Sequence, residues 1–350
     1  MTREIRGPFE RISNRSALIM GAALVGGLVE VGRAAIHRNA PNIVGVKSYY
    51  EDEGPSFIFV RGCGENYQAQ APLLHKKVGG YGSLHFEYQV DGIHSQKAID
   101  QNIIAACKED GERDRVLVCT SMGLMNTMRS LKNPAVIDAI GKDKLKAIVS
   151  RSGITSKHDL QTSMQQAAHA SLFFSGIPVV GNAWRLSRLS RADGEIEHSK
   201  SVTAKEARLH HESSAYMPFH LVASQYRAIH YSAAWQPGSH TEVVEENPDL
   251  RLYQLTAEYD GVADWKKTNK SLQGSFELPV ETIIDERRHH GSHADDLEFI
   301  EPLEELMMKL SGRSRTMAAA ARNLVAVRDM DLSMVARPFC PIGGLLYTGR

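Results

Sequence analysis

The sequence has little of what would indicate a disulfide-rich, metal-binding or nucleic-acid-binding protein. Its 350 residues include four widely spaced cysteines and no C-x-x-C pair, so neither a disulfide framework nor a zinc ribbon can be read from them. Lysine plus arginine number 41, as do aspartate plus glutamate, so charge gives no reason to expect nucleic acid as a partner. No glycine-rich nucleotide fingerprint is present. The sequence therefore implies no cofactor and no metal.

An apolar segment at residues 16–29 follows four arginines and is interrupted by Glu30. It is too short for a comfortable transmembrane helix, which needs about 20 apolar residues. A basic leader before an apolar segment has the layout of a signal peptide or a short anchor, although no convincing small-x-small cleavage site follows. The alternative is an amphipathic helix packed on the protein or on a membrane. The sequence leaves cytoplasmic, membrane-associated and exported locations open.

Short apolar or alternating segments bounded by turn residues predict a series of strands. They fall at residues 41–50, 56–60, 81–90, 116–120, 145–149, 250–255 and 280–284. Segments with one-face apolar spacing predict helices between several of them. Strands that alternate with helices in this way favour an α/β fold, with a doubly wound, mostly parallel sheet and helices on both faces.

The alternation stops at residues 152–248, where bulky apolar islands recur at irregular spacing. Such islands suggest short helices that form a cap over the sheet, and an ordinary helical excursion without further role is the alternative. The sequence thus predicts a helix or anchor at residues 1–40, a core at 41–151 and 249–312, a helical cap at 152–248 and a C-terminal tail at 313–350.

The predicted strand at residues 116–120 ends in Ser121, and helical spacing of apolar residues begins directly after it. A sharp strand-to-helix turn is what a nucleophile elbow requires, because the strained backbone lifts the serine hydroxyl clear of the sheet. Neighbours two residues away must be small for strand and helix to pass. Gly123 meets this requirement, whereas Cys119 stands where the usual G-x-S-x-G pattern has glycine. An ordinary strand-to-helix turn is the alternative interpretation.

A serine hydroxyl needs a histidine to take its proton and a carboxylate to orient that histidine. Asp260 follows the sixth predicted strand, and His293, preceded by two small residues, follows the last. In an open parallel sheet the loops at the carboxyl ends of the strands converge on one cleft. Ser121, Asp260 and His293 are therefore expected to meet there, in the chain order Ser, Asp, His.

Each assignment has a competitor. Asp264 is the second candidate for the acid, and His289 and His290 compete with His293 for the base. These histidines and the aspartates that follow could also be read as a metal cluster, but their spacing matches no ligand motif. Cys119 is a weaker nucleophile candidate than Ser121, because a strand residue at this position should point into the packed sheet.

In its order of motifs the sequence resembles the α/β-hydrolase family, over residues 43–310 with the cap inserted at 152–248. The segment at residues 61–64, Arg-Gly-Cys-Gly, looks like that family's His-Gly-x-Gly loop, with Arg61 in place of histidine. Residues 260–262 are similar to its acid loop and residues 291–293 to its Gly-x-His. The resemblance implies that the backbone N–H groups of Cys63 and Met122 form the oxyanion hole.

The expected reaction is hydrolysis of a carboxylic ester or thioester through an acyl-Ser121 intermediate. The apolar islands of the predicted cap suggest an apolar acyl or alcohol group in a small-molecule substrate. The alternative is a protein that keeps the fold without the catalysis and serves as a binding or scaffold protein, tethered to a membrane by residues 16–29. The departures from the family pattern at Cys119 and Arg61 motivate this alternative.

Overall fold

The computed structural model describes residues 14–36, 43–63, 67–161, 219–257, 260, 262–285, 300–322 and 327–330. The described strands form one 8-stranded sheet in the order β7-β6-β5-β4-β2-β3-β1-β8. Their bounds are β1 Ile43–Tyr49, β2 Ser56–Val60, β3 Ser83–Asp91, β4 Arg115–Thr120, β5 Leu145–Arg151, β6 Arg251–Ala257, β7 Val280–Asp285 and β8 Val327–Met330.

The sheet is mostly parallel, as the sequence predicts. Each neighbouring pair from β3 through β2, β4, β5 and β6 to β7 is parallel. At the other edge β1 pairs antiparallel with β3, and β8 pairs antiparallel with β1. Strand β8 lies within the segment that the sequence predicts as a C-terminal tail, so part of that segment extends the sheet.

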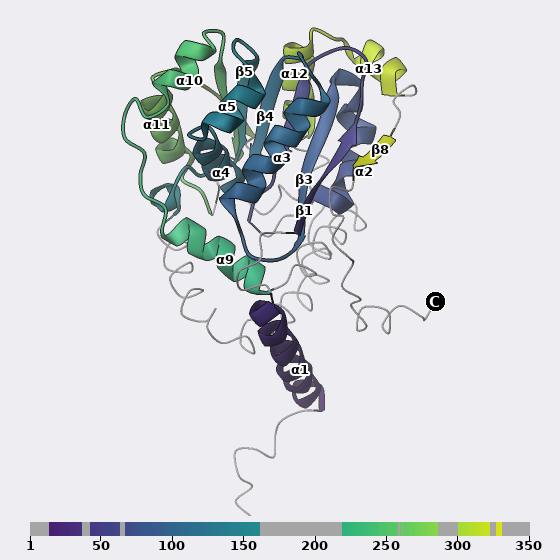
Figure 1. The fold of residues 1–350 in the computed structure, drawn as a ribbon, viewed down its shortest axis with the longest axis vertical. Coiled ribbons are helices and arrows are strands. Elements are labelled where there is room, and N and C mark those ends of the chain that lie inside the picture. The colour runs from purple at the N-terminus through teal and green to yellow at the C-terminus, as the bar shows by residue number, and fades with distance from the viewer. Residues whose placement is uncertain are drawn as a thin grey trace, which may run out of the picture.

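Helices cover both faces of the sheet (Figure 1). Helices α2, α12 and α13 contribute to the core on one face, whereas α3, α4, α5, α10 and α11 contribute to the core on the other. The α-helices are α1 Asn14–Ile36, α2 Tyr67–Val78, α3 Gln96–Glu109, α4 Met122–Ser130, α5 Pro134–Ile140, α9 Phe219–His230, α10 Thr241–Glu246, α11 Trp265–Phe276, α12 Ile300–Ser311 and α13 Arg315–Arg322, and the 3-10 helices are η1 Gly79–Tyr81 and η2 Lys157–Asp159.

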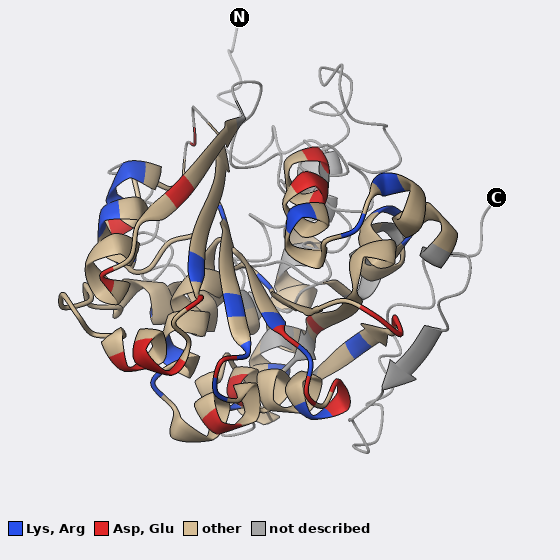
Figure 2. Cartoon of the chain, turned by 90° about the horizontal axis from the view of Figure 1, so that it is seen from above, with Lys and Arg blue, Asp and Glu red and all other residues tan. Residues whose placement is uncertain are grey.

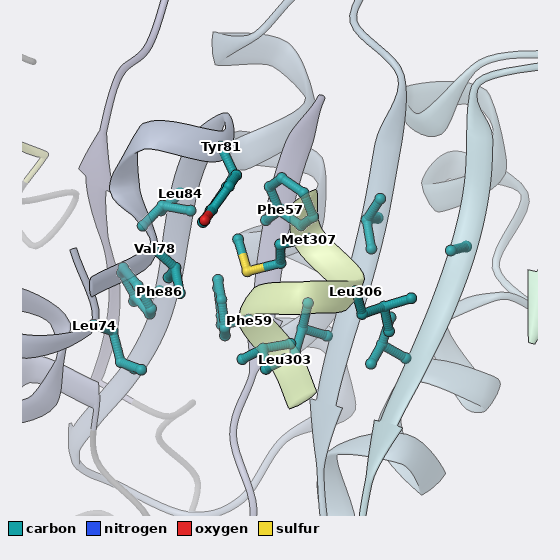
Figure 3. Close-up of a cluster of buried hydrophobic side chains, with 14 of the residues drawn as sticks. Phe57, Phe59, Leu74, Val78, Tyr81, Leu84, Phe86, Leu303, Leu306 and Met307 are labelled. Atoms are coloured by element: carbon teal, nitrogen blue, oxygen red, sulfur yellow. The ribbon is translucent and has the colours of Figure 1, made fainter. Parts of the chain in front are cut away.

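The first core is rich in aromatic side chains. Phe59 and Phe86 stack with ring centroids 4.5 Å apart, and the ring of Tyr67 lies 5.6 Å from that of Phe86. In Figure 3 the side chains of Leu303 and Met307 on α12 lie beside those of β2 and β3. Side chains from one face of the sheet thus pack directly against α2 and α12.

Of the predicted cap, the structure describes residues 152–161 and 219–248, which include α9 and α10. The rest of the cap lies outside the described residues.

Figure 2 shows basic and acidic residues interspersed over the face that it presents, in keeping with equal numbers of the two in the sequence.

Candidate active site

The parallel strands β2, β4, β5, β6 and β7 all end at the same edge of the sheet. The ladder pairs Val60 with Cys119, Thr120 with Arg151 and Arg151 with Leu255, so these strands are in step along their length. The segments that follow β2, β4 and β6 carry the predicted oxyanion loop, nucleophile and acid. The fold therefore brings these three predicted segments to one edge, where ligands of open α/β sheets bind.

Ser121 occupies the turn between β4 and α4 in a strained conformation. Its backbone angles are φ 49° and ψ −117°, outside the regions that non-glycine residues usually adopt. Such strain costs on the order of 1–3 kcal/mol and persists only when the surroundings enforce it. Here the N–H of Ser121 donates to the carbonyl of Arg151 at 2.9 Å, and its own carbonyl accepts from the N–H of Ile154 at 3.1 Å. The side chain is partly exposed, as a nucleophile requires.

The positions two residues away from Ser121 differ in how tightly they are packed. A Cβ atom on Gly123 would lie 2.3 Å from the carbonyl oxygen of Val60 and 2.8 Å from that of Arg61, so only glycine fits beside the end of β2. Cys119 is fully buried, and its thiol donates to Thr127 Oγ1 at 3.1 Å. The site of the departure from the family pattern therefore has room for a cysteine side chain within the core between β4 and α4.

Asp260 is 5% exposed and is held by the chain that follows it. Its Oδ1 accepts from the N–H groups of Val262 and Ala263, each at 2.8 Å. The competing acid, Asp264, caps α11 through a hydrogen bond from the N–H of Lys267, and its Oδ2 lies 3.2 Å from Lys267 Nζ. The carboxylate of Asp264 thus serves as the N-terminal cap of α11.

A small apolar cluster, here called the site cluster, joins the segments at this edge. It contains Met122, Met125, Ile154, Leu160, Ile229 and Ala263, with Cys63, Ala228 and Val262 packed against it. These residues follow β2, β4, β5 and β6 or belong to α9. The cluster shows that the predicted oxyanion residues Cys63 and Met122 lie in one group with the residues next to Asp260.

Comparison with solved structures decides the fold. The chain superposes on an esterase from Exiguobacterium antarcticum with a TM-score of 0.53 at 12% sequence identity, covering 77% of this chain and 95% of the esterase. It superposes on the esterase RhEst1 from Rhodococcus sp. ECU1013 with a TM-score of 0.52 at 14% identity, covering 76% and 95%. The value for MenH from S. aureus is 0.51 at 14% identity, covering 77% and 99%. The chain has the α/β-hydrolase fold. No protein-family model and no curated protein matches the sequence.

Within this α/β-hydrolase fold, Arg61 and Glu87 form a buried pair that sequence reasoning did not foresee. Arg61 is 2% exposed and Glu87 is 4% exposed. The backbone N–H of Arg61 donates to Glu87 Oε2 at 3.4 Å, and Arg61 Nε lies 4.0 Å from Glu87 Oε1. The same Oε1 accepts from Asn102 Nδ2 at 3.4 Å. Glu87 thus ties the start of the loop after β2 to strand β3 and helix α3.

The predicted oxyanion donors, Met122 and Cys63, lie at the start of α4 and in the turn after β2. Met122 is the first residue of α4, where a helix has backbone N–H groups without intrahelical partners and the positive end of its dipole. Cys63 lies in the turn after β2. Burial raises the pKa of its thiol to about 12, although the charge of Arg61 acts against it. Burial likewise raises the pKa of Cys119 to about 12, so neither cysteine is a thiolate at neutral pH.

His94, in the segment after β3, is a partly buried histidine near Arg61. Burial lowers its pKa to about 3, and the charges of Arg61 and Arg129 add to this effect. Its ring is therefore neutral at neutral pH. Its backbone N–H donates to Ser224 Oγ on α9 at 2.9 Å, which links the loop after β3 to this helix.

The predicted base His293 lies outside the described residues, as do its competitors His289 and His290. The segment that carries them begins directly after β7. In the part of the chain that the structure describes, no group of three or more His, Cys, Asp or Glu side chains could hold a metal ion. The choice among the three histidines stays a prediction.

Two other serines share features with a hydrolase nucleophile without its accessibility. Ser48 Oγ lies 2.9 Å from His85 Nδ1, and His85 Nε2 lies 2.6 Å from Asp110 Oδ2, the order of groups in a catalytic triad. Ser48 is 1% exposed and His85 is fully buried. Ser152, after β5, has φ 43° and is also fully buried. A substrate carbonyl cannot reach either hydroxyl. Both serines can therefore serve as control positions when the reactivity of Ser121 is measured.

Proposed function

We propose that the chain is a serine hydrolase that cleaves a carboxylic ester or thioester through an acyl-Ser121 intermediate. The observation that carries this proposal is the strained backbone of Ser121, with φ 49°, at a partly exposed position directly after β4. Strain of this kind is kept where function needs it, because a relaxed turn would be more stable. Two of the solved structures that share this fold are themselves described as esterases.

In the proposed reaction Ser121 Oγ attacks the carbonyl carbon of the substrate while His293 takes the hydroxyl proton. The N–H groups of Cys63 and Met122 donate to the oxyanion, an effect worth on the order of 3 kcal/mol per donor. The proton then passes from His293 to the departing alcohol or thiol, which leaves acyl-Ser121. Water, deprotonated by His293, attacks this ester and releases the carboxylic acid. Asp260 orients the histidine throughout.

Asp260 suits the orienting role better than Asp264. Two backbone N–H groups hold its Oδ1, so the carboxylate is fixed in the turn after β6, and Oδ2 is the atom through which it would bind His293. Asp264 instead holds the first turn of α11. A rigid carboxylate keeps the histidine in the correct tautomer and stabilises the imidazolium that forms.

The substrate is proposed to be a small molecule with an apolar acyl or alcohol group. Support for this choice comes from the partly buried apolar residues Cys63, Ala228 and Val262, which pack against the cluster that contains Met122, the neighbour of Ser121. Burying each methylene of an acyl chain against such side chains contributes about 0.8 kcal/mol. Turnover is therefore expected to be higher for esters of longer acyl chains than for acetyl esters.

Membrane association through residues 16–29 is also proposed, because this segment is apolar and follows four arginines. Within the described residues no helix is both long and apolar enough to cross a bilayer.

A panel of p-nitrophenyl esters and acyl thioesters tests the proposed function. The wild-type chain should hydrolyse at least one member, and Ser121→Ala and His293→Ala should each reduce kcat by about 10⁴–10⁶-fold. His289→Ala and His290→Ala are the matched controls and should keep most of the activity. No turnover that depends on both Ser121 and His293 would instead support the binding or scaffold protein.

The acid is tested by two substitutions of the same kind. Asp260→Asn keeps an oxygen for the N–H groups of Val262 and Ala263 but should reduce kcat by about 10⁴-fold, because the histidine loses its tautomer. Asp264→Asn retains a good helix cap and should leave kcat within a few-fold of the wild type. The reverse pattern would assign the acid to Asp264.

A further inference from the structure

Large exposed apolar side chains are concentrated on helix α1. Seven of the ten that are exposed in the described residues belong to this helix, among them Leu28, which is 67% exposed, and Met20, which is 62% exposed. The full set on α1 is Met20, Leu24, Val25, Leu28, Val29, Val31 and Ile36. Single exposed apolar residues are common on protein surfaces. A contiguous group of them marks a surface that binds another protein, a membrane or an apolar ligand.

Helix α1 is packed the opposite way from a helix on the surface of a globular core. Its residue Gly27 is buried, and Gly26 and Ala34 are partly buried, whereas the seven large apolar side chains named above are exposed. Gly27 and Ala34 are seven residues apart and share one helical face. The helix contacts α9 and otherwise projects beyond the body of the molecule (Figure 1). A soluble surface helix would turn its large apolar residues inward.

Deepening the membrane association proposed above for residues 16–29, we propose that α1 binds the surface of an anionic lipid bilayer, with its large apolar side chains inserted among the lipids and its glycine and alanine face toward α9. Residues 1–15 contain four arginines against two glutamates, so the segment before the apolar part carries a net positive charge that anionic headgroups attract. Interfacial helices combine such a basic flank with an apolar face.

The width of the apolar face favours a bilayer over a second copy of the helix. At about 100° per residue, the seven exposed apolar residues cover roughly half of the helix circumference. A pair of helices buries a narrow seam, and side chains on either side of it stay in water. A bilayer surface covers a broad face at once. The uncharged segment at residues 16–29 would span only about 21 Å as a helix, less than the roughly 30 Å hydrocarbon core, so the helix lies in the surface.

Bound in this way, α1 would set the orientation of the rest of the chain. Helix α9, which α1 contacts, contributes Ala228 and Ile229 to the site cluster. The bilayer would then lie on the same side of the molecule as the cluster. This orientation is inferred from the position of α1 and does not depend on catalysis. Lipid binding can therefore be measured whether or not the chain hydrolyses an ester.

Sedimentation of the full chain with vesicles tests the proposal. The wild type should sediment with vesicles of phosphatidylcholine and phosphatidylserine. A smaller fraction of it should sediment with vesicles of phosphatidylcholine alone. Added salt should weaken the binding, because it screens the arginines. The double variant Leu24→Asp/Leu28→Asp should reduce the partition coefficient by on the order of 100-fold. Met317→Asp, at an exposed apolar residue on α13, is the matched control and should bind as the wild type does.

Circular dichroism and unfolding curves of both variants establish that they remain folded. Equal binding of the wild type and of Leu24→Asp/Leu28→Asp to the anionic vesicles would overturn the proposal. Light scattering tests whether this face of α1 binds a second copy of the chain instead of lipid. If the wild type is a dimer that the double substitution dissociates, and neither form binds vesicles, the face is an interface between two copies and the proposal fails.

Discussion

Ser121 and Ser152 directly follow the adjacent strands β4 and β5, and both have positive φ angles. Of the two, only Ser121 is accessible to solvent. The N–H of Ser121 donates to the carbonyl of Arg151, while the N–H of Ser152 donates to that of Leu255. The same strand-end geometry thus recurs from β4 to β5. What separates the two residues is exposure, since Ser152 is fully buried and Ser121 is not. Strain alone does not identify a nucleophile, and strain at an accessible hydroxyl narrows the choice to Ser121.

The close approach of α4 to β2 predicts a cost for any side chain at Gly123. Gly123→Ala should lower the free energy of unfolding by about 1–3 kcal/mol, because its Cβ would lie 2.3 Å from the backbone oxygen of Val60. Gly274→Ala, on α11, is the control, since a Cβ atom there would meet nothing within 4 Å. That change should raise stability by up to about 1 kcal/mol. Urea unfolding of the two variants measures the difference, and equal effects would contradict the proposed crowding at Gly123.

The buried pair at Arg61 predicts that Glu87 positions the loop after β2. Glu87→Gln should reduce kcat with little change in KM, since the proposed oxyanion donor, the N–H of Cys63, lies two residues beyond Arg61. It should also reduce the free energy of unfolding by up to about 3–5 kcal/mol, because the charge of Arg61 stays buried without its partner.

Glu281→Gln is the control for this substitution. Glu281 forms a half-exposed ion pair with Lys309, so its loss should change stability by less than about 1 kcal/mol and leave kcat unchanged. If Glu87→Gln keeps the full kcat, or raises KM and leaves kcat alone, Glu87 has no part in positioning the oxyanion loop.

The predictability of the site differs among its residues. Ser121 and Asp260 could be proposed from the sequence because Ser121 directly follows one apolar strand and Asp260 comes three residues after another, and strand ends are visible in the local pattern. The pairing of Arg61 with Glu87 joins residues 26 positions apart across two strands. Nothing local in the sequence reports that contact, and the burial of Arg61 contradicts the usual exposure of arginine.

At the scale of elements, a hydrogen-bonded chain fastens β1, β3 and the end of α3 together. Ser48 on β1 contacts His85 on β3, and His85 contacts Asp110 directly after α3. Burial by itself would raise the pKa of Asp110. The hydrogen bond with His85, together with the charges of His85 and Arg113, outweighs that effect and holds its pKa below the ordinary value.

This lowered pKa predicts an acid-dependent loss of stability. The ionised Asp110 stabilises the folded state fully above the unfolded pKa of about 3.9, and that contribution is lost as pH falls through the lower folded pKa. Asp110→Asn should therefore be less stable than the wild type at neutral pH and should lose less stability between about pH 5 and 2. Asp249→Asn, at a residue whose side chain is 80% exposed, should follow the wild-type profile. Urea unfolding over this pH range measures both, and parallel profiles for all three proteins would contradict the role of Asp110.

Elements with a local pattern could be predicted, and those that depend on distant partners could not. The strands β2, β4 and β5 lie within a few residues of their predicted positions, because continuous apolar runs bounded by turn residues mark buried strands. Strand β8 has four residues, Val-Arg-Asp-Met, without alternation, and its only support in the sheet is its pairing with β1. Its partner lies far away in the sequence, so no window around it indicates a strand.

For the whole molecule, the alternation of strands and helices sufficed to predict a mostly parallel sheet covered on both faces. It did not predict which strands lie at the edges, because the order β7-β6-β5-β4-β2-β3-β1-β8 depends on crossovers that leave no mark in composition. The convergence of the segments after β2, β4 and β6 follows from the parallel arrangement itself. The site cluster, whose six buried members are at most 5% exposed, packs these segments against one another.

Covalent labelling with a fluorophosphonate tests the central claim most directly, because such a probe reacts with an activated serine. Intact-mass spectrometry of the wild type should show one adduct, at Ser121. Ser121→Ala should show none, while Ser152→Ala, at the strained but buried serine, and Ser48→Ala, in the buried chain with His85, should still be labelled. Labelling that survives Ser121→Ala in a folded protein would contradict the assignment of Ser121 as the nucleophile.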